Sequence, residues 1–358
     1  MTLSKRDYSL TGVEGELARQ KGLVEAEWYA CHVPRQTMKQ LMIRRNGPAL
    51  RDTFIWFVML IGSGYLLYLS WGSWWVIPAL IAYAIIQNLP AVSRFHELMH
   101  GTPFKTAWLN ETMYQITAFM SAIPATLYRW SHVRHHTDTI IVGRDREYFA
   151  ERPPNGKGLL LYTLGYLGFI NSFKGMIRHS IGYVNSDEKS FIPESAFRKL
   201  FWEARIWVLI YIGLIAWCFA AGTILPLMYV GLVPLVLGSP AWAALTITQH
   251  GGLSEDVLDH RLNTRTFYTN PVLQFLYTNM NYHLEHHMFP MVPYYNLPKL
   301  HEIIKSDCPR AYPSFWSAFV EGLKAVYRQR KEPTYTPVRP LPASARPFRY
   351  HPNNDLVS

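Results

Sequence analysis

The chain has 358 residues, of which 49% are hydrophobic and only 17% are charged. Its mean hydropathy lies close to zero, which excludes a protein embedded in a membrane throughout and favours apolar helices joined to large polar parts. The net charge of +10 is typical of a membrane protein with basic cytoplasmic loops, although anionic lipid, an acidic protein or nucleic acid would also suit it; we expect no nucleic-acid partner.

The N-terminal 51 residues are polar and carry nine Lys/Arg against five Asp/Glu. They lack an early apolar core, so we predict no signal peptide and interpret residues 1–52 as a cytoplasmic segment. The three cysteines are far apart and form no Cys-x-x-Cys pair. This excludes a disulfide framework and an iron–sulfur or rubredoxin-like centre within the chain.

Four apolar runs follow, at residues 54–69, 74–90, 206–221 and 224–248. A membrane-spanning helix needs about 20 apolar residues, a length that these runs reach if flanking tryptophans lie at the interface. The short links at 70–73 and 222–223 carry no Lys or Arg, whereas the termini and residues 94–205 are basic. The pattern predicts two helical hairpins, with both termini and the long middle segment in the cytoplasm.

Two further apolar stretches, at 113–127 and 159–170, are shorter and favour interfacial or re-entrant helices. The segment from Pro333 onward is proline-rich, which predicts an extended tail, either packed as an arm or disordered. We therefore expect an all-α integral membrane protein: four transmembrane helices in two hairpins, and a cytoplasmic helical cap that holds a di-metal site. The expected catalytic domain covers residues 53–305, followed by a cytoplasmic tail at 306–358.

Three clusters contain eight of the 14 histidines. Each lies beside an apolar run, and imidazole is the commonest metal ligand in proteins. Residues three and four apart share one face of a helix, so each cluster can act as a multidentate ligand. Together they exceed what one four-coordinate zinc requires, which indicates two metals. The clustered histidines are His96, His100, His132, His135, His136, His283, His286 and His287.

Other interpretations of the first cluster remain open. His96-Glu97-Leu98-Met99-His100 matches the His-Glu-x-x-His motif of zinc proteases, in which Glu97 would be the general base. That motif is short, and a zinc hydrolase would leave the other two clusters without a role. By residue type alone, iron, zinc or manganese could occupy an imidazole-rich site.

As a set, the three clusters resemble the membrane fatty acid desaturase and hydroxylase superfamily, whose histidine boxes flank two pairs of spans. The run from Asn281 to Pro290 is similar to the third box, and the resemblance covers about residues 50–305. It implies a non-haem di-iron centre held mainly by histidine, with O2 as co-substrate. It also implies a ninth ligand at the inner end of the fourth span, the position of His250.

Carboxylates should orient ligating imidazoles through the second ring nitrogen. The candidates are Glu97, Asp138, Asp145, Glu147 and Glu285, of which Asp138 is favoured because it follows the second cluster directly. Asn281 could reach a metal through water or could cap a helix. The remaining histidines, which we interpret as surface or packing residues, are His32, His179, His260, His301 and His351.

The resemblance implies O2-dependent C–H oxidation, most simply desaturation of a fatty acyl or similar apolar chain. A hydroxylase or monooxygenase on the same scaffold, acting on a smaller molecule, is the alternative. Two departures from the family pattern weaken any statement about the substrate. The first box has Glu97 where many acyl desaturases have aspartate, and the chain has Asp145-Arg146-Glu147 in place of an Asp-Pro-Asp/Glu turn. A metal-binding or lipid-binding membrane protein without enzymatic activity is the non-catalytic alternative.

The electrons should come from a separate donor, because the chain has no Cys motif for iron–sulfur, no Gly-x-Gly-x-x-Gly loop and no His-Pro-Gly-Gly haem motif. We expect a ferredoxin, rubredoxin or cytochrome with its reductase, and membrane lipid around the spans. The expected location is a multi-pass position in a membrane, with a bacterial inner membrane favoured and the active site in the cytoplasm.

Overall fold

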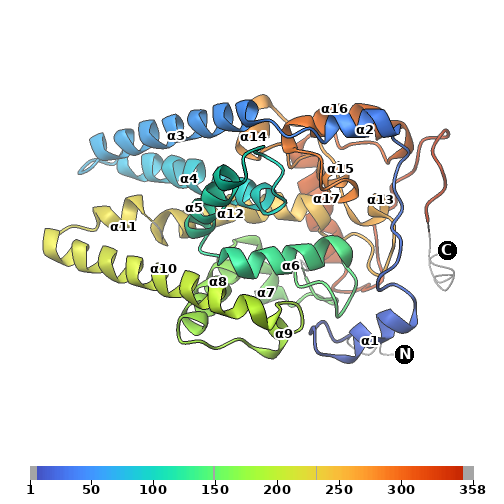
Figure 1. Ribbon diagram of the computed structural model, residues 1–358, viewed down its shortest axis with the longest axis horizontal. Coiled ribbons are helices and arrows are strands. Elements are labelled where there is room, and N and C mark those ends of the chain that lie inside the picture. Colours follow the sequence, from blue (N-terminus) through green and yellow to red (C-terminus); the bar gives the residue numbers. More distant parts are fainter. Residues whose placement is uncertain (1–5, 148–149, 231, 350–358) are drawn as a thin grey trace.

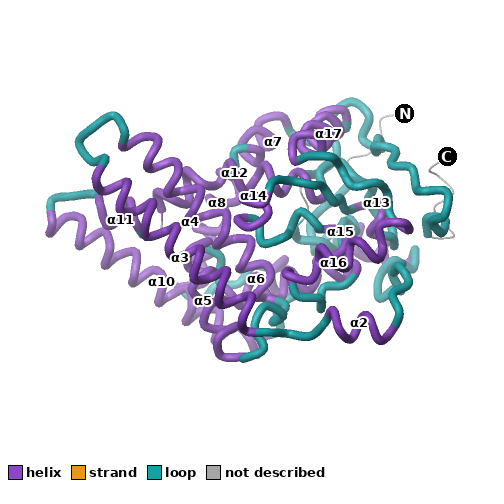
Figure 2. The backbone as a smooth tube through the Cα atoms, turned by 90° about the horizontal axis from the view of Figure 1, so that it is seen from above, coloured by secondary structure: helices purple, strands orange, loops and turns teal. Residues whose placement is uncertain are grey.

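The computed structural model describes residues 6–147, 150–230 and 232–349. This part of the chain is helical and contains two isolated β-bridges but no strand. Long helices extend to one side and shorter helices gather at the other (Figures 1 and 2). The long helices are α3 (Asn46–Leu69), α4 (Val76–Met99), α10 (Glu194–Ala221) and α12 (Leu232–His250), and the short α11 (Leu225–Tyr229) precedes α12.

Four segments are long and apolar enough to cross a membrane: Arg35–Leu69, Val76–Met99, Glu194–Ala221 and Leu225–His250. They correspond to the four runs predicted from the sequence. Many of their large apolar side chains are exposed, among them Ile61, Ile77 and Phe219 at 72%, 52% and 84%. Such a contiguous apolar surface on several helices is what a lipid-facing surface requires.

The helices of the two pairs pack differently. α3 lies along α4 (Figure 1), whereas α12 packs mainly against α4, and α11 contacts both α10 and α12. The predicted fourth run at 224–248 is divided between α11 and α12, because Val230 adopts an extended conformation. α12 therefore belongs to the centre of the molecule, where its last residue, His250, lies beside the end of α4.

Shorter helices form the rest of the molecule. The expected stretch at 113–127 is divided between two helices at Ala122, which has φ +53, and the stretch at 159–170 is divided at Gly165, which has φ +75. The remaining elements are α1 (Val13–Gln20), α2 (Arg35–Leu41), α5 (Ala107–Ser121), α6 (Ala125–Thr137), α7 (Gly156–Thr163), α8 (Tyr166–Ser180), α9 (Ser186–Lys189), α13 (His260–Asn263), α14 (Pro271–Leu276), α15 (His283–Met288), η1 (Tyr294–Asn296), α16 (Leu297–Ile304), η2 (Lys305–Asp307) and α17 (Phe315–Arg328).

Gly238 allows α12 to approach α4 closely. A Cβ at this position would lie 2.4 Å from Asn88 Cβ and 2.8 Å from the Ala84 carbonyl oxygen. We expect G238A to separate the two helices and to lower the free energy of unfolding by about 1–3 kcal/mol, the usual cost of overpacking. The measurement is the thermal unfolding midpoint in one detergent. G213A on α10, where nothing lies within 4 Å of the added Cβ, is the control, and equal midpoints for the two variants would contradict the prediction.

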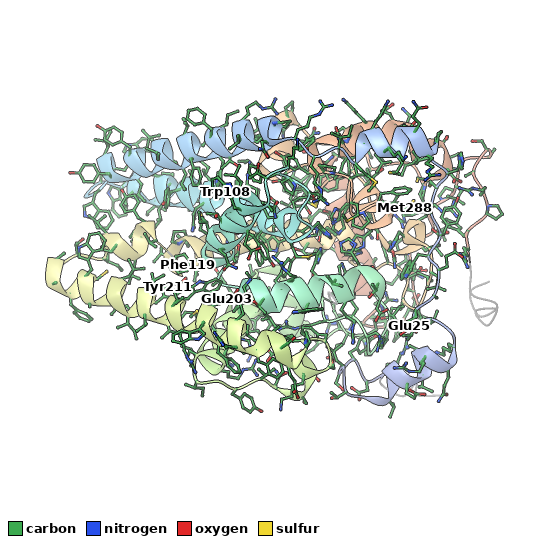
Figure 3. All side chains as sticks on the ribbon, in the orientation of Figure 1. Glu25, Trp108, Phe119, Glu203, Tyr211 and Met288 are labelled. Atoms are coloured by element: carbon green, nitrogen blue, oxygen red, sulfur yellow. The ribbon has the colours of Figure 1, made fainter. Side chains whose placement is uncertain are left out.

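Glu203 on α10 positions the start of α6, the helix that carries the second histidine cluster. Its carboxylate accepts hydrogen bonds from the Thr126 backbone N–H and hydroxyl, both at 2.9 Å. Phe119 on α5 packs against Tyr211 on α10 nearby, with ring centroids 5.5 Å apart (Figure 3). α10 therefore fixes α6 from its first turn, since an acceptor at a helix N-terminus satisfies otherwise unpaired N–H groups.

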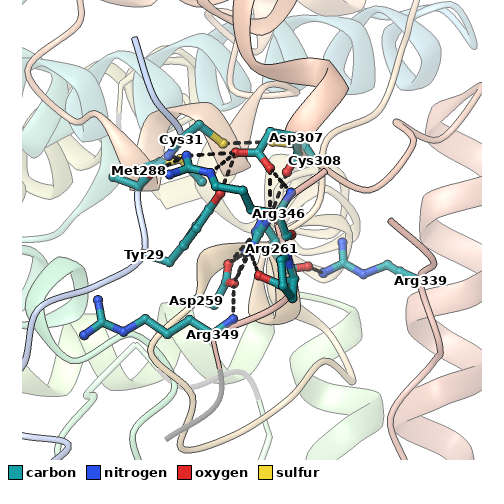
Figure 4. A network of polar contacts seen from close by, with 12 residues as sticks. Tyr29, Cys31, Asp259, Arg261, Met288, Asp307, Cys308, Arg339, Arg346 and Arg349 are labelled. Carbon is teal, nitrogen blue, oxygen red and sulfur yellow. Dashed lines mark hydrogen bonds and ion pairs between the residues drawn. The ribbon is translucent and has the colours of Figure 1, made fainter. Parts of the chain in front are cut away.

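An N-terminal segment at Tyr29 and the C-terminal segment at residues 346–347 meet at Arg261 (Figure 4). Its guanidinium is fully buried, bonds Asp259 at 2.7 Å and donates to the carbonyl oxygens of Arg346 and Pro347 at 3.0 and 2.9 Å. The ring of Tyr29 lies 3.6 Å from the guanidinium carbon. The proline-rich tail is thus a packed arm as far as residue 349, while His351 and the last residues lie outside the described part.

Loss of Arg261 should destabilise this part of the protein strongly. In R261M the buried Asp259 carboxylate would have no arginine partner, and breaking a buried pair costs about 3–5 kcal/mol. R328M is the matched control, because Arg328 and Glu332 are each 53% exposed and an exposed pair contributes at most about 1 kcal/mol. Denaturation midpoints measured in one detergent should separate the variants; similar small shifts would mean that the network contributes little.

A buried thiol pair lies next to this junction. Cys31 Sγ and Cys308 Sγ are 3.6 Å apart, and the Cys31 N–H donates to Met288 Sδ at 3.1 Å. Both thiols are free. The N-terminal segment is therefore packed directly against the end of α15, which carries the third histidine cluster (Figure 4).

Candidate metal centre

Nine buried or half-buried histidines meet where α4, α6, α12 and α15 end or begin. They form two groups whose ligand nitrogens lie within 4.8 Å of one another: a five-histidine group (His96, His100, His132, His136 and His286) and a four-histidine group (His135, His250, His283 and His287). All eight cluster histidines and His250 are included. The second cluster contributes to both groups, because His132 and His136 are one turn apart while His135 points to the other group.

The Nε2 atoms within each group are close together. They are separated by 2.8 Å for His96 and His286 and by 3.1 Å for His286 and His136 in the larger group, and by 3.0 Å for His283 and His250 in the smaller one. Ligand nitrogens held about 2.1 Å from a shared ion at right angles lie about 3.0 Å apart. The residues present therefore fit two metal ions, each surrounded by imidazoles.

In several of the nine histidines, the opposite ring nitrogen is held by a partner outside the two groups. His135 Nδ1 bonds Asp145 at 2.9 Å, His132 Nδ1 bonds Glu147 at 2.9 Å, and His250 Nδ1 donates to the Asn263 carbonyl at 2.8 Å. These contacts fix the tautomer, so that Nε2 carries its lone pair toward the centre of the group. Such partners orient ligating imidazoles in metal proteins.

Burial keeps most of the imidazoles neutral. It lowers the pKa of His100 and of His286 to about 3, and it lowers the pKa of His132, His136 and His287 well below the usual range. At His135 burial also lowers the pKa, but the adjacent Asp145 carboxylate outweighs it and raises the pKa above the usual value. Neutral imidazole is the form that binds a metal. Burial also raises the pKa of Glu147 to about 7, although this carboxyl is bonded to His132.

Some of the carboxylates that we predicted to orient the imidazoles bond a histidine ring of the centre, and others do not. Asp138 bonds Arg144 and not an imidazole, because it ends α6 with φ −128 and turns away from the helix. Asp145, ten residues beyond His135, bonds that ring instead. The preference for Asp138 rested on sequence proximity, whereas the loop after α6 folds back and brings Asp145 and Glu147 to the cluster.

The other candidates lie at the edge of the centre. Glu97 Oε1 is 3.1 Å from His286 Nδ1, outside hydrogen-bond geometry. Glu285 accepts from the Thr266 hydroxyl and bonds His301 Nδ1, both at 2.5 Å, so its contacts are not with the nine histidines. The Asn281 amide N–H donates to the Phe267 carbonyl, and its Oδ1 has no partner within the described chain.

The histidines outside the clusters are not members of either group. His32 is exposed, and His179 is buried against Glu188 at 3.1 Å. His260 is also buried, stacks on Trp28 with ring centroids 4.2 Å apart and lies 5.2 Å from the His287 ring. His260 has no neighbouring histidine that would form a motif, and the Asn263 carbonyl, as a backbone acceptor, leaves no trace in residue type; neither could be found from the sequence.

A cavity of about 320 Å³ opens directly onto the centre. Five of the nine histidines line it, and Phe95, Leu127 and Trp242 contribute apolar walls. Binding pockets commonly have about 300–1,000 Å³ and mostly apolar walls. The cavity can therefore hold an apolar group next to the histidines and keep water away from it.

The fold and the site together define a class: helical membrane proteins with a histidine-rich metal site. The chain belongs to the fatty acid desaturase family, since the family model described as fatty acid desaturase matches residues 69–319. It is 25% identical over 273 residues to fatty acid conjugase FAC2 B of Calendula officinalis, covering 67% of this chain and 70% of the relative. It is 20% identical over 347 residues to Delta(6)-fatty-acid desaturase fat-3 of Caenorhabditis elegans, covering 86% and 74%.

Family membership makes the chain an oxidoreductase of the membrane desaturase type, as the sequence predicted. It also leaves the zinc hydrolase interpretation without support, because His96 and His100 share their group with histidines from the other two clusters. These two relatives come from a plant and a nematode and give no support to the expected bacterial inner membrane.

Proposed function

We propose that the protein oxidises an unactivated C–H bond of a fatty acyl or similar apolar chain, with O2 as co-substrate and two irons held by the nine histidines. The observation that carries the proposal is the pair of histidine groups beside one apolar cavity. Two ions bound there would supply the redox chemistry that O2 and an unreactive C–H bond demand.

The protein's own residues have separate tasks in this proposal. Asp145 and Glu147 hold the rings of His135 and His132. Phe95, Leu127 and Trp242 bind the apolar part of the substrate and exclude water. Position decides the outcome: loss of two hydrogens gives an alkene, and insertion of one oxygen gives an alcohol.

The arrangement in the membrane belongs to the same proposal. The four apolar segments cross as two hairpins, and residues 53–305 form the catalytic domain. Both termini, the histidine groups and the cap formed by the shorter helices face the cytoplasm. The basic N-terminal 51 residues support this orientation. A separate ferredoxin, rubredoxin or cytochrome delivers electrons from that side, with its own reductase.

The first test is the metal content of detergent-purified protein from iron-replete cells. About two irons per chain, with O2 consumption when a reductant is supplied, is the expected result. One zinc that iron does not displace would contradict the proposal. Because a histidine-rich site can be misloaded, two zincs would require iron reconstitution, and reconstituted protein that consumes no O2 would also contradict it.

A hydroxylase acting on a smaller molecule is the second candidate. The modest size of the cavity and the polar side chains of Ser131, Asn171 and Thr246 in its wall favour it. Mass spectrometry of the product separates the two: an alkene is two hydrogens lighter than the substrate, and an alcohol is one oxygen heavier.

A further inference from the structure

Two cavities share a wall next to the histidines. The apolar cavity of about 320 Å³ reaches the metal-binding rings. A second groove of about 690 Å³, with more polar and charged side chains in its wall, runs between the N-terminal segment, the loop after α6 and helices α7, α8 and α9. Arg146, Gly168 and Asn171 line both. A ligand at this wall would therefore be in contact with the chamber that holds the reacting carbon.

Arg146 presents unused donors to both cavities. Its side chain is 35% exposed, and its ion pair with Glu188 is long, at 3.9 Å. Within the described ranges, no hydrogen bond to its guanidinium is present, although guanidinium carries five N–H donors. Glu188 is already bonded to His179 and Arg178, each at 3.1 Å. Arg146 is thus held by this long ion pair and by Phe191, whose ring lies 5.3 Å away, while its N–H groups donate no hydrogen bond within the described ranges.

α8 adds two more donors on the same side. Asn171 and Lys174 are three residues apart and line the groove, and both are exposed. Neither makes a hydrogen bond within the described chain. The carboxylates of the groove are engaged: Asp145 with His135, Asp187 with Thr11 at 3.2 Å, and Glu188 as above, and Glu151 also has a partner. The remaining groups, on Arg146, Asn171 and Lys174, are hydrogen-bond donors, and two of them are cationic. Such a set is complementary to an anion.

We propose that Arg146, with Asn171 and Lys174, binds an anionic group of the substrate, either a carboxylate or a phosphate. This inference rests on the proposed function and names the substrate class of that same site. Guanidinium suits both anions, because its planar fork can donate two parallel hydrogen bonds.

The position of Arg146 also limits where oxidation occurs. It lies between Asp145 and Glu147, the two residues that bond the rings of His135 and His132. The bound anion is therefore only one side chain away from the histidines. The substrate is oxidised close to its acidic end, in contrast to an acyl chain whose head group stays far outside the chamber.

The test measures binding and does not require turnover. Octanoate, octyl phosphate and 1-octanol are titrated calorimetrically into the full-length protein in one detergent. Hydrogen bonds to a charged group predict that the anions bind about tenfold or more tightly than the alcohol. R146Q should lose most of this preference and bind octanol unchanged. R146K, which keeps the charge but not the fork, should be intermediate.

R205Q is the matched control, because Arg205 on α10 donates to the Ser180 carbonyl at 2.9 Å and lines neither cavity. It should keep the wild-type preference. Metal content and the thermal midpoint of each variant show whether it is folded. If R146Q does not fold and R146K does, R146K is compared with wild type instead. We then expect R146K to show a smaller preference for the anions over octanol.

The outcomes distinguish a carboxylate from a phosphate, and they distinguish failure of the anion site from failure of the proposed oxidation. A preference for octanoate alone assigns a carboxylate, and a preference for octyl phosphate alone assigns a phosphate. Wild-type protein without any preference for anions, or folded variants at Arg146 that retain the full preference, would overturn the inference. An Arg146-dependent preference in a protein that contains no iron would leave the anion site standing and remove only the proposed oxidation.

Discussion

An H286A variant should fold, lose metal from the five-histidine group and lose its activity. His286 is fully buried, and its Nε2 lies 2.8 Å from that of His96 and 3.1 Å from that of His136. It is thus the ring through which the third cluster joins the first two. Removal of a residue that only supports a ligand typically costs 10–100-fold in metal affinity or activity, so loss of the ring itself should cost at least about 100-fold.

Metal analysis and product formation are measured on the same preparation, together with its elution volume. H32A is the control, because His32 is exposed and outside both groups; it should behave as wild type. Full metal content and full activity in H286A would show that this ring is not a ligand. Loss of the folded protein in both variants would show only that the preparation fails.

The second large effect is expected for D145N. The Asp145 carboxylate bonds His135 Nδ1 at 2.9 Å and also accepts from the Ile140 and Glu147 backbone N–H groups at 2.8 Å. In D145N the side-chain amide presents a neutral acceptor or a donor to the His135 ring. The hydrogen bond that fixes the tautomer with Nε2 directed inward is therefore weaker. We expect metal affinity or activity to fall about 10–100-fold.

D138N provides a demanding control seven residues earlier. Asp138 is as buried as Asp145, at 2% against 4% exposed, but its carboxylate bonds Arg144. This variant should be less stable yet retain its metal. If D138N lost metal and D145N kept it, the assignment of orienting carboxylates from the structure would be wrong, and the expectation from sequence proximity would be right. Metal titrations of the two proteins side by side decide the question.

The spans and the histidines were predictable for different reasons. The spans follow from long apolar runs, and α4 extends the run at 74–90 to Met99 only because the helix continues past the apolar part to carry His96. The histidines follow from their spacing, since His132 and His136 share a helical face. His250 was expected only from the resemblance, because a single histidine after an apolar run has no pattern of its own.

What the sequence did not reveal depends on contacts between distant segments. Which histidines share a group is decided by the crossing of α4, α6, α12 and α15, so His135 separates from its neighbour His136. The break between α11 and α12 arises from the extended backbone at Val230, within a run that is apolar throughout. The proposed role of Arg146 depends on two cavities, one of which is formed by segments as far apart in sequence as Tyr8 and Glu188.

The division of the histidines along the chain bears on biosynthesis. A ribosome that has completed residue 250 has made six of the nine histidines. The four-histidine group then has only His135 and His250, and His286 is missing from the other group. Arg261 receives the carbonyls of Arg346 and Pro347 later still. Both groups are complete only once His287 has been made, so two ions can be bound by full sets of histidines only after all four apolar segments have been synthesised.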